Sequence, residues 1–323
     1  MSHSRNLPDA EAFDELMLIA PLSHVAPRAD PADAPAAPSD VDQIAFAGPS
    51  GITVGRFRCA PHHPSFRDSG PIRQAVVVFP RTSVRIRHEG SRDFVADPTV
   101  VTLYNRAQRY ARQPVSPDGD RCDWFGLPDA LAHDIAVEVA PQLKRGEARP
   151  FGALERAPAT AHLYHRQRTL FARIVARRAT AMEVEEETMT LVASVLALAA
   201  IDGGHASAAV GAARRRELAE ATRATLAVTM HENRSVIEIA RMVGASPFHL
   251  CRTFKAETGM TMHAYRVRLR LARALENLEA RGRDLSAIAH ELGFASHAHF
   301  TRHCRDAYGA PPSAVRAQLA LGT

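Results

Sequence analysis

The chain has 323 residues, with 40 Lys+Arg against 35 Asp+Glu and a formal net charge of +5. This length accommodates two domains, and a content of 46% apolar and 23% charged residues is typical of a folded globular protein. The most apolar run, residues 192–201, falls well short of the roughly 20 residues that a membrane-spanning helix needs. The composition therefore excludes a single small module, wholesale disorder and a membrane-spanning protein.

Residues 1–40 are expected to form a disordered tail, because the stretch 27–40 is dense in Pro, Ala and Asp and has little to bury. Three acidic residues precede the short apolar run 16–20, whereas a secretory signal has a basic stretch at that place. No Cys-x-x-Cys pair occurs among the four cysteines, which are Cys59, Cys122, Cys251 and Cys304. We therefore expect a cytoplasmic chain with reduced thiols.

Residues 41–200 are expected to form one domain that begins with strands and ends with helices. Short runs rich in β-branched residues alternate with turn-forming Gly, Pro and Asp, and the clearest of them are 52–54, 75–79, 84–87 and 100–104. This pattern favours a small β-barrel or a β-sandwich. Apolar residues then recur at steps of three and four, which predicts helices up to residue 200, the last of them over 183–200.

A change of composition near residue 201 predicts a domain boundary. Residues 201–211 are mostly small and are expected to form a linker. From Gly211 to the end there are 17 basic and 10 acidic residues, whereas the preceding chain has 23 and 25. The two parts therefore carry +7 and −2, which predicts that residues 212–323 bind a polyanion, most commonly nucleic acid. A solvated arginine-rich surface is the alternative.

The basic segment contains the same helix-turn-helix pattern twice. Residues 236–244 match 285–293, and residues 246–259 match 296–309 after a shift of register by one. In each copy a glycine would end the first helix in the left-handed conformation, and a serine would cap the second helix. One such match also occurs in enzymes that never touch DNA, but two copies in one basic segment predict a DNA-binding domain.

One continuous helix over 262–279 is expected to join the two copies and to span about 27 Å. Its buried stripe would consist of Val267, Leu271, Ala274 and Leu278. Arginines are expected on its exposed surface, where one or two would contact phosphate; they are Arg266, Arg268, Arg270 and Arg273.

The doubled pattern resembles the AraC/XylS family of transcription regulators. The resemblance covers roughly residues 212–318 and rests on 237–244 with 254–259 in the first copy, and on 284–289, Gly293-Phe294 and 309–312 in the second. It implies an α+β protein: a cupin-like amino-terminal β-barrel that binds a small effector, helices that dimerise, and a DNA-binding domain over 212–323.

The function implied is a sequence-specific DNA-binding transcription regulator of the activator type. It would be a cytoplasmic homodimer without cofactor or catalytic activity, with double-stranded DNA and a small-molecule effector as partners and RNA polymerase as a further candidate partner. The residues themselves fix neither the effector nor the operator, and they leave activation and repression both open.

The resemblance also assigns DNA-binding positions to the two recognition helices. They are Ser246, Phe248, His249, Cys251 and Arg252 in the first copy, and Ser296, His297, Ala298 and Arg302 in the second. Arg252 and Arg302 can each make a bidentate contact to guanine in the major groove; a surface arginine bound to phosphate or solvent is the alternative. The sequence departs from the family where Cys251 and Ala298 replace larger polar residues and where Cys304 replaces an aromatic one.

A metal-dependent cupin enzyme fused to a DNA-binding domain is the competing hypothesis. Such a metal site needs a His-x-His, a carboxylate and another histidine. His62 and His63 are adjacent, so on a strand they would point to opposite faces of the sheet. A metal cluster of these histidines with Cys59 and Cys122 is less expected than buried cysteines and loop histidines. We therefore assign no metal ligand, and we regard Trp124 and Tyr104 as pocket candidates with core packing as the alternative.

Overall fold

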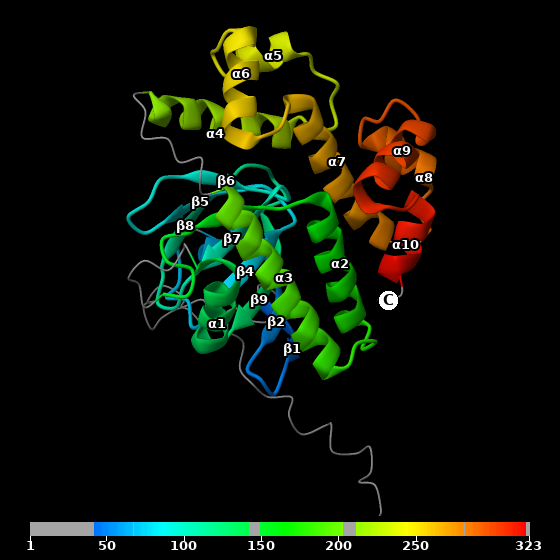
Figure 1. Cartoon of the computed structure of the whole chain (residues 1–323). Helices are drawn as coiled ribbons and strands as arrows, with labels where there is room; N and C mark the ends of the chain where they lie inside the picture. Colours follow the sequence, from blue (N-terminus) through cyan, green and yellow to red (C-terminus); the bar gives the residue numbers. More distant parts are fainter. Residues whose placement is uncertain (1–41, 67, 142–148, 203–210, 281, 321–323) are drawn as a thin grey trace, which may run out of the picture.

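The computed structural model describes residues 42–66, 68–141, 149–202, 211–280 and 282–320. The predicted tail and most of the predicted linker lie outside this part of the chain. Among the described residues, strands and α-helices both lie within 42–202, whereas the elements within 211–320 are all helices (Figure 1). The predicted α+β organisation, with strands first and an all-helical carboxy-terminal part, is therefore confirmed. Within the described ranges no helix is long and apolar enough to cross a membrane.

The strands of the described residues form two antiparallel sheets. One has the order β1-β2-β9-β4-β7-β10 and the other the order β3-β8-β5-β6. Their bounds are β1 (Asp42–Ala47), β2 (Thr53–Cys59), β3 (Asp68–Ser69), β4 (Ala75–Pro80), β5 (Val84–His88), β6 (Phe94–Ala96), β7 (Val100–Tyr104), β8 (Tyr110–Pro114), β9 (Asp120–Leu127) and β10 (Arg156–Pro158). In the described part of the chain no strand pairing joins the two sheets, so the domain is a two-sheet sandwich and not the closed barrel that the resemblance implied.

The alternation of side chains along β4 explains why the larger sheet is covered on both faces. Ala75, Val77 and Phe79 belong to the core shared with the helices, whereas Val76 and Val78 pack in the core between the sheets. Successive side chains of a strand point to opposite faces, so one apolar run serves both cores. The domain therefore has three layers: helices, the larger sheet and the smaller sheet.

The helical layer consists of α1 (Asp129–Val139), α2 (Ala161–Val175) and α3 (Ala181–Asp202). The predicted helix over 183–200 lies within α3, whose last two residues are the first two of the predicted linker. The short strand β10 lies in a region that periodicity assigned to helices only. Its three residues pair with β7, and three residues are too few to show a period of two.

The carboxy-terminal part contains α4 (Ala212–Val228), α5 (Val236–Met242), α6 (Pro247–Thr258), α7 (Met262–Glu279), α8 (Leu285–Glu291), α9 (His297–Tyr308) and α10 (Pro312–Ala320). Helix α7 has the predicted bounds and joins the pair α5–α6 to the pair α8–α9 (Figure 1). All four residues of its predicted stripe are buried. Apolar residues of α7 to α10 share one core with α2 and α3, so the two parts of the chain pack as a unit.

Candidate nucleic-acid interface

The first helix-turn-helix unit is formed by α5 and α6. Ser235 begins α5 through a capping box, in which its hydroxyl accepts a hydrogen bond from the Glu238 N–H and the Glu238 carboxylate accepts one from the Ser235 N–H. Gly244 has φ +68° just after α5, and Ser246 caps α6, where Pro247 is the first residue. The local signals predicted for this turn are therefore confirmed.

The second unit is formed by α8 and α9 and uses the same devices. Asp284 accepts a hydrogen bond from the Ala287 N–H at 2.8 Å, and Ser296 caps α9. Gly293 has φ +78°, and a Cβ built on it would lie 2.4 Å from the carbonyl oxygen of His231. This glycine is therefore required twice, for its left-handed backbone and for close contact with the loop that follows α4.

The predicted DNA-binding residues lie on, or directly before, the two recognition helices α6 and α9. All of them are exposed; they are Ser246, Phe248, His249, Cys251, Arg252, Ser296, His297, Ala298 and Arg302. Neither Arg252 nor Arg302 forms an ion pair or a side-chain hydrogen bond with another described residue. Both guanidinium groups are therefore available to a ligand, and base reading by them remains a prediction.

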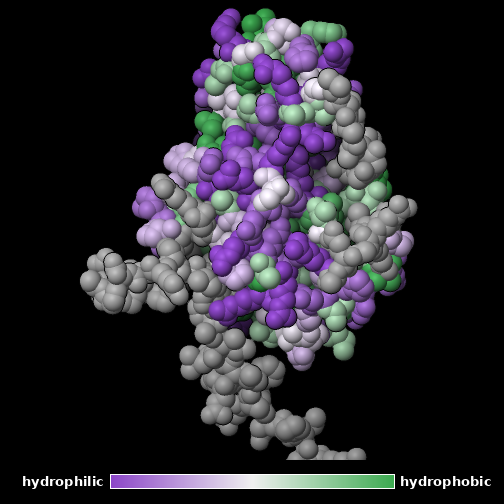
Figure 2. All heavy atoms as spheres, turned by 90° about the vertical axis from the view of Figure 1, so that its left-hand side faces the viewer, coloured by the Kyte–Doolittle hydropathy of each residue, from purple (hydrophilic) through white to green (hydrophobic). Residues whose placement is uncertain are grey.

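Apolar side chains are exposed beside the first recognition helix. Phe248, at the start of α6, is 77% exposed, and Ile237 and Met242 of α5 are 59% and 52% exposed. Figure 2 shows hydrophobic residues among hydrophilic ones at the top of the molecule, where α5 and α6 lie in Figure 1. An exposed aromatic ring at the start of a recognition helix suits apolar contact with a thymine methyl group in the major groove.

Two half-buried histidines of α9 contact each other. The Nε2 atoms of His299 and His303 lie 2.9 Å apart, and both rings pack near Phe294. Burial lowers the pKa of both imidazoles, and the nearby Arg302 lowers them further. At neutral pH one neutral ring therefore donates to the other, and the pair stabilises the start of α9.

Comparisons with known proteins agree with this geometry. Residues 239–318 match a protein family described as a helix-turn-helix domain. The chain is 38% identical over 71 residues to the regulatory protein Ada of Salmonella typhimurium, a match that covers 22% of this chain and 20% of that protein. It is 38% identical over 69 residues to the transcriptional activator RhaS of Pectobacterium carotovorum, which covers 21% and 25% of the two chains.

A solved transcriptional regulator from Chromobacterium violaceum, described as an AraC-type DNA-binding domain-containing protein, is 33% identical to this chain. The match covers 34% of this chain and 96% of that chain, with a TM-score of 0.31. Residues 239–318 form an AraC-type helix-turn-helix domain. The chain spans a quarter or less of the length of the two curated relatives, so the likeness to them is confined to this domain.

Within the AraC-type domain, the arginines of α7 are not on the surface, and this expectation from the sequence was wrong. Arg270 is 4% exposed and donates to the carbonyl oxygens of Gly293 at 2.7 Å and Glu232 at 3.1 Å. The others are half-buried: Arg266 bonds the Arg234 carbonyl, Arg268 bonds the Ala159 carbonyl, and Arg273 lies 3.4 Å from Asp118. The reason is that α7 is enclosed by both units and by the amino-terminal domain.

The structure places Cys304, one of the departures noted from the sequence, in the core. Its side chain is buried in the cluster that also holds Phe300 and Tyr308. Burial raises the pKa of the Cys304 thiol to about 12, so the thiol stays neutral. It packs as a small apolar side chain, and the core of the AraC-type domain is continuous at this position.

An ion-pair cluster fastens α7 of the AraC-type domain to the amino-terminal domain. This interdomain cluster consists of Arg81, Asp123, Arg168, Glu276 and Glu279. The Arg81 guanidinium contacts Glu276 at 2.6 and 2.7 Å and Glu279 at 2.8 Å. Arg168 of α2 donates to both glutamates. The arginines lie more than 100 positions from Glu276 and Glu279 in the chain, so no sequence pattern could have revealed these pairs.

The side chains at the centre of the interdomain cluster are almost fully excluded from solvent. The side chains of Asp123 and Arg168 are 0% exposed and that of Arg81 is 2% exposed. Burial opposes ionisation of Asp123 and Glu276, but Arg81 and Arg168 outweigh it and hold the pKa of both carboxyls below the ordinary value. Because Asp123 and Glu276 are charged at neutral pH, loss of either arginine leaves buried charge without its partner.

A second contact holds the amino-terminal end of α7. The Tyr265 hydroxyl donates to the Asp97 carboxylate, and both side chains are buried. Nearby, Glu220 of α4 accepts hydrogen bonds from the Val95 N–H at 2.6 Å and from Arg156 at 2.8 Å. The AraC-type domain is thus docked at both ends of α7, while its recognition helices stay exposed.

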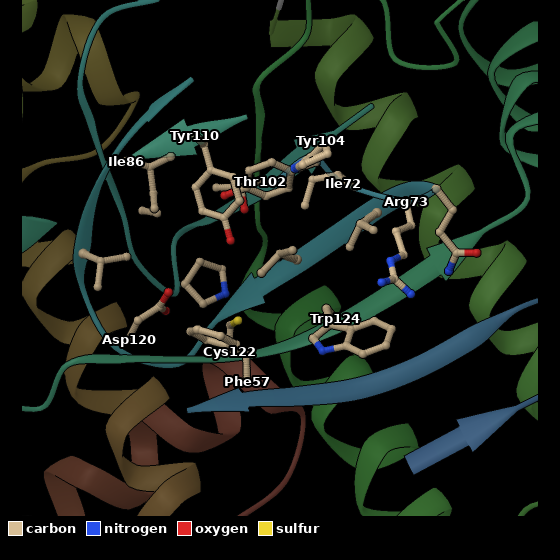
Figure 3. A pocket seen from close by; sticks show the side chains of 17 residues that line it. Phe57, Ile72, Arg73, Ile86, Thr102, Tyr104, Tyr110, Asp120, Cys122 and Trp124 are labelled. Carbon is tan, nitrogen blue, oxygen red and sulfur yellow. The ribbon is translucent and has the colours of Figure 1, made fainter. Parts of the chain in front are cut away.

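A cavity of about 740 Å³, including its open mouth, lies between the two sheets. Trp124 and Tyr104 line it, so the sequence-based pocket candidates are confirmed as lining residues (Figure 3). Cys122 and Trp124 of β9 face this cavity, whereas Asp123 between them faces α2 and α7. A single strand therefore connects the cavity wall with the interdomain cluster.

The histidines considered for a metal site lie in the turn after β2 and not on a strand. His62 is exposed and His63 is half-buried. In the described part of the chain, no group of three or more His, Cys, Asp or Glu side chains is placed to hold a metal ion. Cys59 and Cys122 are buried, as expected for core cysteines.

We expect the free energy of unfolding of the protein to fall as the pH is lowered from 6.5 to 5. His165 of α2 packs on Tyr308 of α9 with ring centroids 4.9 Å apart, and burial lowers the pKa of its imidazole to about 4. The unfolded chain binds a proton near pH 6.5 and the folded chain does not, so the contribution of His165 is complete above pH 6.5 and is lost as the pH falls toward 4. The loss at pH 5 is about 2 kcal/mol.

Urea unfolding at pH 7 and pH 5 measures this effect. The variant His165→Gln should lose less stability on acidification than the unmodified protein, whereas His133→Gln, which removes an exposed histidine of α1, should behave like the unmodified protein. Equal pH dependence in all three proteins would contradict the role given to His165.

Proposed function

We propose that the protein is a sequence-specific DNA-binding transcription regulator that responds to a small molecule bound between the sheets of its amino-terminal domain. One observation carries this proposal: two matched helix-turn-helix units, joined by the single helix α7, present exposed recognition residues on α6 and α9. Such units place their second helix in the major groove. The relative from Pectobacterium is named a transcriptional activator, and activation is the direction of regulation that we propose for this chain.

Contacts in the structure connect the cavity between the sheets to the recognition helices. Helix α7 sets the relative position of α6 and α9, and the interdomain cluster binds α7 to Asp123 of β9 and Arg81 beside β4. The same two strands form a wall of the cavity. A ligand that shifts these strands would therefore change the attachment of α7, and with it the position of the recognition helices relative to the amino-terminal domain.

We further propose that the regulator acts in the cytoplasm as a homodimer without catalytic chemistry of its own. One chain carries two recognition helices, α6 and α9, and a two-fold symmetric operator would require two chains. RNA polymerase is the further partner that activation would require.

Binding of duplex DNA by the full chain should weaken steeply as salt rises, because each phosphate contact releases counterions and makes the slope of log K against log salt more negative by about 0.9. The full chain is the proper reagent, since the core of the second unit is shared with α2 and α3. Sites are first selected from a random-sequence duplex pool, and affinities are then measured at two salt concentrations.

Enrichment of one sequence motif together with a negative salt slope is the expected result. A pool that shows no enriched motif, or affinity indifferent to salt, would overturn the proposed function. Scrambled duplexes of the same composition are the control, and they should show the salt dependence with weaker binding.

A further inference from the structure

The cavity between the sheets offers accessible apolar surface to a ligand. Val76 and Val78 of β4 line it and are only half-buried, although their neighbours Val77 and Phe79 on the other face of the strand are fully buried. Val84 and Ile86 of the smaller sheet face them across the cavity (Figure 3 labels Ile86). An apolar body placed between the sheets would remove this surface from water.

Aromatic walls give the cavity a fixed shape. The indole of Trp124 lies against Gly55 of β2, where a Cβ would come within 2.2 Å of the ring. Tyr104 and Tyr110 stack with ring centroids 4.6 Å apart, and burial raises the pKa of Tyr110 to about 12, so its hydroxyl stays neutral. The walls are therefore rigid and uncharged, which suits a compact body such as a single ring.

The one acidic lining residue is already neutralised. Asp120 lies 2.7 Å from the Arg112 guanidinium, whose side chain is 0% exposed and sits over the rings of Phe57 and Tyr110. The carboxylate that lines the cavity is therefore already paired with a buried cation and is not free to bind a cationic ligand. An anionic group carried deep into the cavity would face Asp120 and lose its hydration. The interior thus selects a neutral body.

The mouth of the cavity has the opposite character. Arg73 lines the cavity and is exposed, and among the described residues its guanidinium has no ion pair and no hydrogen bond. Figure 3 shows its charged end directed to the side of the cavity where Trp124 lies. An arginine in this position can bind a carboxylate through two parallel hydrogen bonds while the rest of the ligand lies between the sheets.

We infer that the cavity binds a compact, mostly apolar monoanion whose ring or alkyl body lies between Trp124, Val78 and Ile86 and whose carboxylate meets Arg73 at the mouth. This inference rests on the proposed function and names the chemical class of its effector. Neutral molecules of the same shape bind more weakly because they leave Arg73 without its partner, and cations are repelled by Arg73.

The chain itself contains the probe for this inference, because Trp124 is its single tryptophan. The full-length protein is titrated with 4-tert-butylbenzoate, with the neutral 4-tert-butylbenzamide and with the cationic 4-tert-butylbenzylammonium while the emission of Trp124 is recorded. The benzoate is expected to bind about tenfold more tightly than the amide, and the ammonium compound least well.

The variant Arg73→Gln should lose the preference for the benzoate over the amide and still bind both. The matched control Arg92→Gln changes another exposed arginine of the same domain, outside the cavity lining, and should keep the preference. Equal affinity for benzoate and amide in the unmodified protein, an unchanged preference in Arg73→Gln, or no response of Trp124 to any of the probes would overturn the inference.

The experiments that test the proposed function and the ligand class have independent outcomes. Salt-dependent binding of a selected duplex tests the DNA-binding function without any effector, and the Trp124 titration is carried out without DNA. If the benzoate fails to bind and the duplex binds, the ligand class is wrong and the regulator stands. If the benzoate binds and no duplex is selected, the cavity inference stands and the DNA-binding function is wrong.

Discussion

Replacement of Arg168 by Met should lower the free energy of unfolding by about 3–5 kcal/mol, the usual cost of removing one partner from a buried ion pair. Met keeps most of the volume of the Arg168 side chain and removes its charge together with the hydrogen bonds to Glu276 and Glu279. Glu276 and Glu279 would then retain Arg81 as their main buried partner, and Asp123 would lose one of its cations. Urea unfolding at pH 7 measures the change.

A neighbouring arginine provides a matched control on the same helix. Arg166 of α2 pairs with Glu187 at 2.7 Å, but its side chain is 35% exposed and that of Glu187 is 34% exposed. Arg166→Met should therefore cost less than about 1 kcal/mol, as exposed ion pairs do. Equal losses in Arg166→Met and Arg168→Met would show that the interdomain cluster contributes nothing beyond an ordinary surface pair.

The decline in the free energy of unfolding at acid pH provides a second test of the interdomain cluster. The arginines hold the pKa of Asp123 and Glu276 below the ordinary value, so this contribution is complete above the unfolded pKa values near 4 and is lost as the pH falls below them. In Arg168→Met the pKa values of Asp123 and Glu276 should lie closer to the ordinary value. The free energy of unfolding should therefore decline less steeply below pH 4.5. A mutation that only disturbed packing would shift the whole curve and leave its slope unchanged.

Local signals predicted the AraC-type domain almost completely. The ends of α5, α6, α8 and α9 depend on glycines, serines and Asp284, each of which acts within a few residues of the sequence. The bounds of α7 and its buried stripe follow from apolar spacing along one helix. In these elements the residues that determine the structure lie within one or two helical turns of it, so a single sequence was sufficient to predict them.

The connections between distant segments could not be predicted in this way. Arg168 and Glu276 are 108 positions apart, and a sequence in which nearly all basic residues are arginine does not mark Arg168 as different from Arg166. The cavity combines residues of seven strands, and no spacing rule brings them together. For the same reason the arginines of α7 were expected on the surface: their acceptors are backbone carbonyls of other segments, which no side-chain pattern reveals.

Arg252→Ala and Arg302→Ala should each relax base preference at one position of the selected DNA site, by about 1–3 kcal/mol for the preferred base over the others. The controls are Lys255→Ala and Arg305→Ala, which change exposed cations one turn further along the same helices and should weaken all sequences alike. Competition binding against duplexes with single substitutions measures both effects. If Arg252→Ala and Arg302→Ala also weaken all duplexes uniformly, the two arginines bind phosphate and do not read bases.

The two relaxed positions should lie about 10 base pairs apart on one face of the duplex. Helix α7 is continuous over 18 residues, about 27 Å, and is held at both ends, so the recognition helices cannot adjust their separation freely. Successive major grooves on one face are about 34–36 Å apart in straight DNA, and the difference would be met by bending that costs a few kcal/mol at most. Five inserted base pairs place the second groove on the opposite face and should reduce affinity to that of a site with one half destroyed. Unchanged affinity after this insertion, with Arg302→Ala also without effect, would show that α9 does not engage DNA and that α6 reads the site alone.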